Sequence, residues 1–174
     1  PLGTGIITTA HKRETVTEDD FQPALHSMQR LNRRASEVLV QAGAAVHAVT
    51  DITGFGILGH SWEMAAQSKT GMRFDFAHLP LLPGIFHYIE EGCTTGGARR
   101  NETYLTPHVT ITRQLSAIER EILWDPQTSG GLLAAIDPAL WPSLQLLAPD
   151  VTFWQIGMVT EKVADEAHVR LEVA

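Results

Sequence analysis

The sequence has very little cysteine and no long apolar run. Cys93 is the one cysteine in 174 residues, so no disulfide can form within the chain. A chain poor in thiols and without a recognisable signal peptide is typical of the cytoplasm. No apolar run approaches the roughly 18 residues that a membrane span needs. We therefore expect a cytoplasmic protein that does not cross a membrane.

Positive charge is also scarce. Lys and Arg number 13 against 20 Asp and Glu, which gives a net charge of −7. This balance argues against general binding to nucleic acid or to an anionic membrane surface. Pro1 stands where an initiator Met is usual, so we expect a processed or excised part of a longer protein, to which the function then belongs.

The chain contains no internal repeat, low-complexity tract or evident linker, and its length suits one domain. We therefore treat residues 1–174 as a single unit. Apolar periodicity and turn residues predict its elements. Strands are expected at 3–9, 44–50, 72–76, 108–112, 132–136, 151–159 and 168–173; helices are expected at 17–42, 57–67, 84–91, 114–123 and after Asp137; loops are expected at 93–103 and 125–131. The predicted class is α+β or mixed α/β, with a single mixed sheet of about six strands flanked by helices.

The turn that follows the strand at 44–50 is the strongest candidate site. Asp51 stands at the end of that strand, where open sheets bind ligands. Its carboxylate suits Mg²⁺, which often bridges to substrate phosphates. Gly54 and Gly56 lack a Cβ, so backbone can approach an anion closely, and the next helix presents its N-terminus. On the residues alone, the commoner interpretation is that Asp51 or Thr53 caps this helix and the glycines form a turn.

Two further loops have both a functional and an ordinary interpretation. The loop at 125–131 (DPQTSGG) either positions a phosphate or is a turn whose glycines permit positive φ. The loop at 94–101 contains Arg99 and Arg100, which suit a phosphate or carboxylate ligand or pair with surface carboxylates. The eight histidines show no zinc-type spacing, so no zinc site is expected. Cys93 has no nearby His or second Cys, which favours an unreactive thiol.

Residues 50–60 (TDITGFGILGH) and 125–133 (DPQTSGGLL) together resemble the selenide, water dikinase (selenophosphate synthetase) family. Further segments resemble it in the same order along the chain, at 1–5 (PLGTG), 30–36 (RLNRRAS), 96–101 (GGARRN) and 155–159 (QIGMV). The resemblance covers essentially all of residues 1–174 and corresponds to the C-terminal domain of that enzyme. It implies the fold of the C-terminal domain of aminoimidazole ribonucleotide synthetase and its relatives.

The resemblance implies an enzyme that makes selenophosphate from selenide, ATP and water, releasing AMP and orthophosphate. Asp51 matches the metal-ligand Asp of the family, and Thr53, Gly54 and Gly56 match backbone close to the phosphates. The implied partners are an N-terminal ATP-binding domain, a second copy in a homodimer, selenide and ATP, with Mg²⁺ as cofactor. The reactive Cys or selenocysteine and the catalytic Lys belong to that N-terminal domain. We therefore expect no catalytic side chain among these 174 residues, and no turnover by them alone.

Two other functions stay open at this point. One is a domain of a different ATP-dependent phosphotransferase of the same superfamily, which releases ADP rather than AMP. The other is a stand-alone interaction module in which the glycine-rich loops are only turns.

Overall fold

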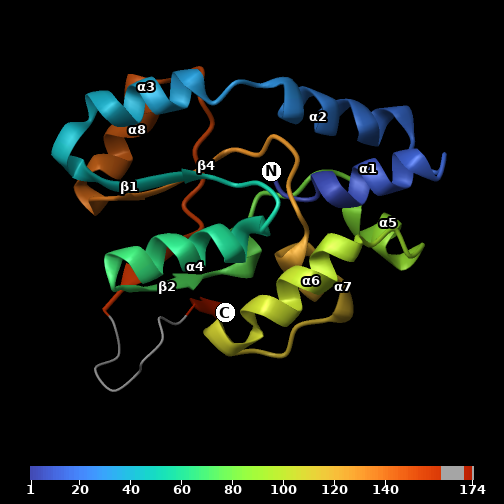
Figure 1. Ribbon diagram of the computed structural model, residues 1–174. Coiled ribbons are helices and arrows are strands. Elements are labelled where there is room, and N and C mark those ends of the chain that lie inside the picture. The colour runs from blue at the N-terminus through green and yellow to red at the C-terminus, as the bar shows by residue number, and fades with distance from the viewer. Residues whose placement is uncertain (162–170, 174) are drawn as a thin grey trace.

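The computed structural model describes residues 1–161 and 171–173. The helices within these residues are α1 (Thr4–Lys12), α2 (Glu18–Gln29), α3 (Arg33–Gln41), α4 (Gly56–Ser68), α5 (Ile85–Glu90), α6 (Gly96–Leu105), α7 (Ala117–Trp124) and α8 (Trp141–Leu147) (Figure 1). The strands are β1 (Val46–Asp51), β2 (Gly71–Phe74), β3 (Val109–Ile111), β4 (Leu132–Ile136), β5 (Gly157–Thr160) and β6 (Leu171–Val173). Short 3₁₀ turns occupy Gly43–Ala45, Phe76–His78, Thr106–His108 and Pro138–Leu140.

The described strands form two sheets. β1 and β4 pair antiparallel, and a four-stranded sheet has the order β3-β6-β2-β5. In that sheet β2 is antiparallel to β5 but parallel to β6, and β3 is also parallel to β6. The mixed α+β class is confirmed, but the single six-stranded sheet was wrong. Helix α4 lies between the two sheets in Figure 1 and packs against both β1 and β2, so the sheets cannot merge.

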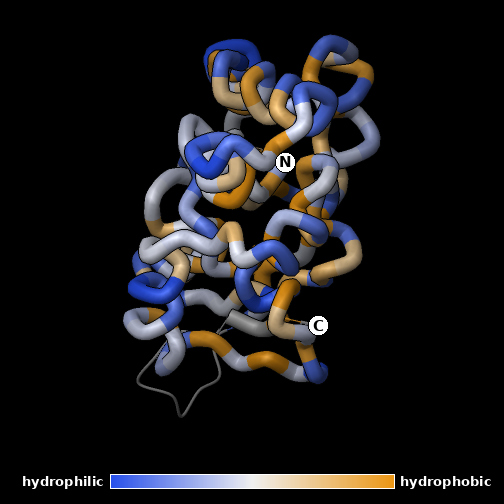
Figure 2. The backbone as a smooth tube through the Cα atoms, turned by 90° about the vertical axis from the view of Figure 1, so that its right-hand side faces the viewer, coloured by the Kyte–Doolittle hydropathy of each residue, from blue (hydrophilic) through white to orange (hydrophobic). Residues whose placement is uncertain are grey.

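One large apolar core contains side chains from α1, α4, α5 and α7. Its fully buried side chains include Ile6, Ile7, Leu58, Ile85, Tyr88, Ile122 and Leu123. A smaller cluster of Val38, Leu144, Ala148 and Val151 lies under α3 and α8. Figure 2 shows apolar and polar stretches alternating along the chain, and no helix in the described part is both long and apolar enough to span a membrane.

Residues 3–9, expected as a strand, instead begin helix α1. The N-cap residue Gly3 has φ of 113° and no side chain that could cap the helix. Two distant side chains accept the first N–H groups instead. Gln127 Oε1 accepts from the nitrogens of Gly3 (3.0 Å) and Thr4 (3.2 Å), and Asp125 Oδ2 accepts from those of Gly5 (3.0 Å) and Ile6 (3.4 Å). A tertiary contact therefore outweighs the β propensity of this segment.

The single helix expected at 17–42 is divided into α2 and α3. Arg30 has extended backbone (φ −72°, ψ 118°) at the break. The loop at 125–131 contacts both sides of it. Ser129 Oγ donates to the carbonyl of Met28 (2.7 Å), and Asn32 Nδ2 donates to the carbonyl of Gly130 (2.9 Å). The apolar spacing shows which residues face the core, whereas the partner loop decides where the helix ends.

The other expected elements vary in how well they match. The predictions for β1, α4, β2, α5, β3, α7 and β4 are confirmed to within a few residues. The expected loop at 93–103 contains α6, which Thr95 caps by accepting from the nitrogen of Ala98 (3.0 Å). Of the strand expected at 151–159, only its last part lies in β5, and the strand expected at 168–173 lies partly outside the described residues.

Gly130 and Gly131 allow a matched test of how closely the 125–131 loop packs. A Cβ on Gly130 would lie 2.1 Å from the carbonyl oxygen of Ile52, whereas one on Gly131 would meet nothing within 4 Å. We expect Gly130→Ala to lower the free energy of unfolding by about 3 kcal/mol, because neither backbone segment can yield without strain. Gly131→Ala should change it by less than about 0.5 kcal/mol. Urea denaturation of both variants measures the difference, and equal stabilities would contradict this packing.

Candidate functional site

The turn between β1 and α4 carries the predicted site residues, of which Asp51 and Gly54 are exposed. Asp51 pairs opposite Leu132 at the end of β1, and it is exposed. The next residue, Ile52, is buried and donates its N–H to the carbonyl of Gly131 (2.9 Å). Thr53 is half-buried and Gly54 is exposed. The buried Ile52 therefore anchors the turn, while its neighbours stay accessible to a ligand.

Neither Asp51 nor Thr53 caps α4. The N-cap position is Phe55, and no side chain in the described part of the chain donates or accepts a capping hydrogen bond there. The carbonyl of Thr53 instead accepts from the nitrogens of Gly56 (2.9 Å) and Gln127 (3.0 Å). The capping interpretation is therefore wrong, and the carboxylate of Asp51 has no structural role in this helix terminus.

The two glycines of the turn have different surroundings. A Cβ on Gly54 would meet no atom within 4 Å, so its backbone is open to a ligand. Gly56 is buried with φ of 67°, and a Cβ there would lie 2.9 Å from the carbonyl oxygen of Asp125. Gly56 therefore provides close packing against the 125–131 loop, and Gly54 provides the accessible backbone.

The 125–131 loop is held by buried polar side chains, and its residue with positive φ is Ser129 (51°) and not a glycine, so the expected turn with glycines at positive φ was wrong. Asp125 is 1% exposed and Gln127 is 4% exposed. Gln127 Nε2 donates to the carbonyl of Asp125 (2.9 Å) and to its Oδ2 (3.1 Å), while Gln127 Oε1 accepts the N–H groups of α1. The nitrogen of Thr128 donates to Thr4 Oγ1 (2.7 Å). This loop therefore fixes the α1 N-terminus and the Asp51 turn together.

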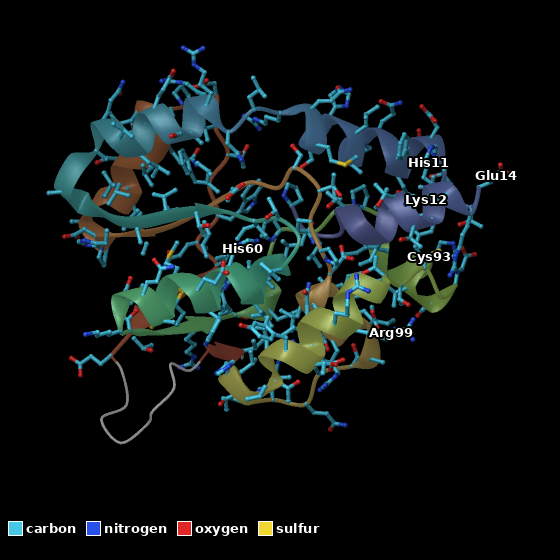
Figure 3. All side chains as sticks on the ribbon, viewed as in Figure 1. His11, Lys12, Glu14, His60, Cys93 and Arg99 are labelled. Carbon is cyan, nitrogen blue, oxygen red and sulfur yellow. The ribbon has the colours of Figure 1, made fainter. Side chains whose placement is uncertain are left out.

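The segment at 94–101 joins the same assembly through Asn101. Its Nδ2 donates to the carbonyls of Gly54 (3.0 Å) and Trp124 (3.1 Å). Arg99 and Arg100 are exposed on the helix that this segment forms, and Figure 3 shows Arg99 on α6. Segments far apart in the sequence thus meet at one turn.

Sequence reasoning missed the roles of Asp125, Gln127 and Asn101. The signal was present, because Asp125 and Gln127 directly follow the apolar run Ile122–Trp124, where a polar side chain continues into the core. Nothing local showed that their partner is the N-terminus of α1, about 120 residues away.

The chemistry of Asp51 fits part of a Mg²⁺ site. Mg²⁺ is commonly held by one or two carboxylates together with substrate phosphates and water. No described residue donates a hydrogen bond to the Asp51 carboxylate, which leaves both of its oxygens available. Within the described residues no three His, Cys, Asp or Glu side chains cluster as a metal site. Within the described residues, Asp51 is therefore a single accessible carboxylate at the turn and not part of a complete metal site.

A groove and the single cysteine lie outside the exposed part of the turn. The groove, of about 490 Å³, runs along β4, and its lining includes Ile52, Gly130 and Gly131 but neither Asp51 nor Gly54. Cys93 is 1% exposed and lies at the C-terminal end of α1 (Figure 3). Its burial supports the expectation of an unreactive thiol.

Burial has a strong effect on Asp125. It raises the pKa of this carboxyl to about 7, although the N–H groups of Ile6 and Gly5 act in the opposite direction. Its Oδ1 is buried with no hydrogen-bond partner in the described structure. The folded chain therefore holds this proton more tightly than the unfolded chain, in which the pKa of an Asp is about 3.9.

This pKa predicts a pH dependence of stability. The contribution of Asp125 is fully present below about pH 4 and is lost as the pH rises through about 7. Relative to the Asp125→Asn variant, the free energy of unfolding of the wild type should fall by about 2–3 kcal/mol between pH 5 and pH 8. Denaturation across this range measures it, with Asp137→Asn as the control because Asp137 is an exposed helix cap. Parallel pH profiles for the wild type and Asp125→Asn would show that the burial effect is absent.

Comparison with known proteins agrees with this architecture. Residues 1–170 match the family model of the AIR synthase related protein, C-terminal domain. The chain is 44% identical over 139 residues to a selenide, water dikinase of Bordetella bronchiseptica, with 80% of this chain and 39% of the relative covered. It is 38% identical over 173 residues to that of Caldanaerobacter subterraneus, with 98% and 49% covered.

A solved structure has the same fold. The thiamine-monophosphate kinase of Stenotrophomonas maltophilia superposes with a TM-score of 0.61 at 15% identity, over 98% of this chain and 47% of that one. The chain thus spans half or less of the length of each of these proteins. With a family model that covers nearly all of its residues, the chain belongs to the AIR synthase related protein, C-terminal domain family.

Proposed function

We propose that this chain is the C-terminal domain of a selenide, water dikinase, which makes selenophosphate from selenide, ATP and water and releases AMP and orthophosphate. The observation that carries the proposal is the 38–44% identity to proteins of that name over most of the chain. The exposed Asp51 beside the open backbone of Gly54 supports it, because phosphoryl transfer needs a metal ligand and close access to phosphates.

The proposed roles follow from the chemistry of each residue. Asp51 holds Mg²⁺, which would supply neutralising charge to the phosphates of ATP. The backbone at Thr53 and Gly54 lies against those phosphates, and Gly56 keeps the turn in place by packing on the 125–131 loop. With a net charge of −7, the domain must attract an anion through local groups and not through its overall charge.

The proposed partners complete the site. One accessible carboxylate cannot form a metal centre alone, and the selenide, water dikinases reported above are at least twice as long as this chain. We propose that an N-terminal ATP-binding domain supplies the other ligands and the reactive Cys or selenocysteine, and that the complete enzyme is a homodimer. A cytoplasmic location stays a prediction from the cysteine content.

No specific observation favours a different phosphotransferase. The likeness to thiamine-monophosphate kinase, at 15% identity, shows the fold alone. The stand-alone module is less well supported, because the glycine-rich segments converge on one turn with an open ligand-facing side. The nucleotide product distinguishes a selenide, water dikinase, which releases AMP, from a different phosphotransferase of the superfamily, which releases ADP.

The 174 residues by themselves should fold but not turn over. The physical reason is the incomplete metal and phosphate site, which offers one carboxylate. Selenide-dependent AMP formation should be at background for the purified chain and measurable for a protein that also contains the N-terminal domain. Turnover by the chain alone at the rate of the complete enzyme would contradict the proposed division of the site.

Asp51→Asn in the complete enzyme should reduce Mg²⁺-dependent turnover at least about 10–100-fold, because a neutral amide oxygen is a weaker metal ligand. The melting temperature should not change, since the carboxylate makes no hydrogen bond within the described structure. Asp19→Asn is the charge-matched control, because Asp19 is also exposed and lies on α2. Full turnover of Asp51→Asn at an unchanged Mg²⁺ requirement would remove Asp51 from the mechanism.

A further inference from the structure

A hydrogen bond and an adjoining ion-pair contact lead from helix α4 back to the candidate turn. His60 Nε2 lies 3.0 Å from Thr53 Oγ1, and His60 Nδ1 lies 3.2 Å from Glu63 Oε2. Figure 3 shows His60 on α4 at the end nearest the turn. Three polar side chains within eleven residues of sequence are therefore connected in the order carboxylate, imidazole, hydroxyl.

The carboxylate decides which ring nitrogen carries the proton. Glu63 Oε2 lies 3.2 Å from His60 Nδ1, and an ionised carboxylate, which can only accept, favours the tautomer with the proton on Nδ1. In the neutral imidazole this leaves Nε2 as an acceptor. The hydroxyl of Thr53 must then donate its single hydrogen to His60. The oxygen of Thr53 keeps its lone pairs for another partner.

The remainder of Thr53 is also fixed. Its carbonyl accepts from the nitrogens of Gly56 and Gln127, which holds the backbone that carries the hydroxyl. Asp51 and Thr53 flank the buried Ile52. The free lone pairs of Thr53 and the free carboxylate of Asp51 are thus presented by the same turn.

We propose that Glu63 and His60 are positioning residues that hold the Thr53 hydroxyl as a donor to His60, so that its oxygen faces a divalent cation or the water that the cation carries. The inference rests on the proposed function, because it assumes that the neighbouring Asp51 holds the cation. It assigns Thr53 to the cation side of the site and leaves contact with phosphate oxygens to the backbone of Gly54.

Two other His–carboxylate pairs show what an ordinary surface pair looks like. The side chains of His78 and His87 are 67% and 63% exposed beside Asp75 and Glu91, and the described structure shows no second polar partner on either ring. The side chain of His60 is 11% exposed, and the ring of Phe55 lies 5.7 Å away. The Glu63 side chain is 45% exposed, so the shelter is on the imidazole, whose hydrogen bond to Thr53 is screened less by water than a surface contact.

The tautomer is measured directly by ¹⁵N NMR of the histidine rings in the 174-residue chain. We expect His60 to carry its proton on Nδ1 and to show an unprotonated Nε2. Glu63→Gln should reduce this preference, because an amide can donate to Nδ1 as well as accept from it. Glu91→Gln is the matched control on His87 and should leave His60 unchanged. A wild-type His60 protonated on Nε2 would overturn the proposal.

Cation contact is measured with Mn²⁺ as a paramagnetic probe on the protein that also contains the N-terminal domain, where the proposed metal site is complete. We expect Mn²⁺ to broaden the amide signals of Thr53 and Gly54, and Mg²⁺ to compete for this site. Glu63→Gln should weaken the competition by Mg²⁺ about tenfold, as is typical when the residue that orients a ligand is changed. No broadening at Thr53 in the wild type, or equal Mg²⁺ affinity in Glu63→Gln, would overturn it.

A double-variant cycle tests whether Glu63 affects Mg²⁺ affinity through Thr53, and the quantity measured is the Mg²⁺ affinity from competition with Mn²⁺. If Glu63 acts through the hydroxyl, Glu63→Gln should have no further effect in a Thr53→Val background, whereas its full effect should remain in Thr53→Ser. Additive effects of Glu63→Gln and Thr53→Val would contradict the proposal. Thr53→Ala, which also lacks the hydroxyl, provides the same test if Thr53→Val does not fold.

The outcomes separate this inference from the proposed function. If Asp51→Asn abolishes Mn²⁺ broadening but Glu63→Gln has no effect, the metal ligand stands and the positioning role fails. If the tautomer and the coupling are as expected but the complete protein forms no selenophosphate, the positioning role stands and the proposed function fails.

Discussion

The buried pair of Asp125 and Gln127 is the interaction on which the rest of the structure depends. Their side-chain oxygens accept the first N–H groups of α1, which the N-cap glycine cannot satisfy by itself. An N–H group left without a partner in the interior costs roughly as much as a lost hydrogen bond. The loop must therefore stay against the helix, and the segments that contact the loop are held by the same constraint.

The candidate turn takes its shape from this loop. On one side, Gly56 and Gly130 allow the two backbones to approach more closely than any Cβ permits. On the other side, Gly54 meets nothing and Asp51 is exposed. The turn is thus closely packed where it meets the protein and open on its other side. Such preorganisation is useful in phosphoryl transfer, where positioning and charge stabilisation account for most of the catalysis.

The chain contributes only part of the proposed chemistry. Its described residues offer one free carboxylate, an oriented hydroxyl and an accessible backbone, and no metal cluster of three ligands. An incomplete site at a domain surface is what a two-domain enzyme produces when substrate binds between its halves. The groove along β4 reaches Ile52 and the 125–131 loop, but its lining does not include Asp51 or Gly54.

The sequence by itself determined the class of fold, most of the elements and the residues of the turn. Alternating and helical apolar patterns are local properties, so β1, α4, β4 and α7 were predictable. It did not determine that 3–9 is helical, that α2 ends near Arg30, or that the strands divide into two sheets. Those features depend on side chains from distant segments, namely Asp125, Gln127 and Ser129, and on the placement of α4. Only the tertiary structure brings such partners together, because hydrogen-bond satisfaction and close packing act between segments and not along them.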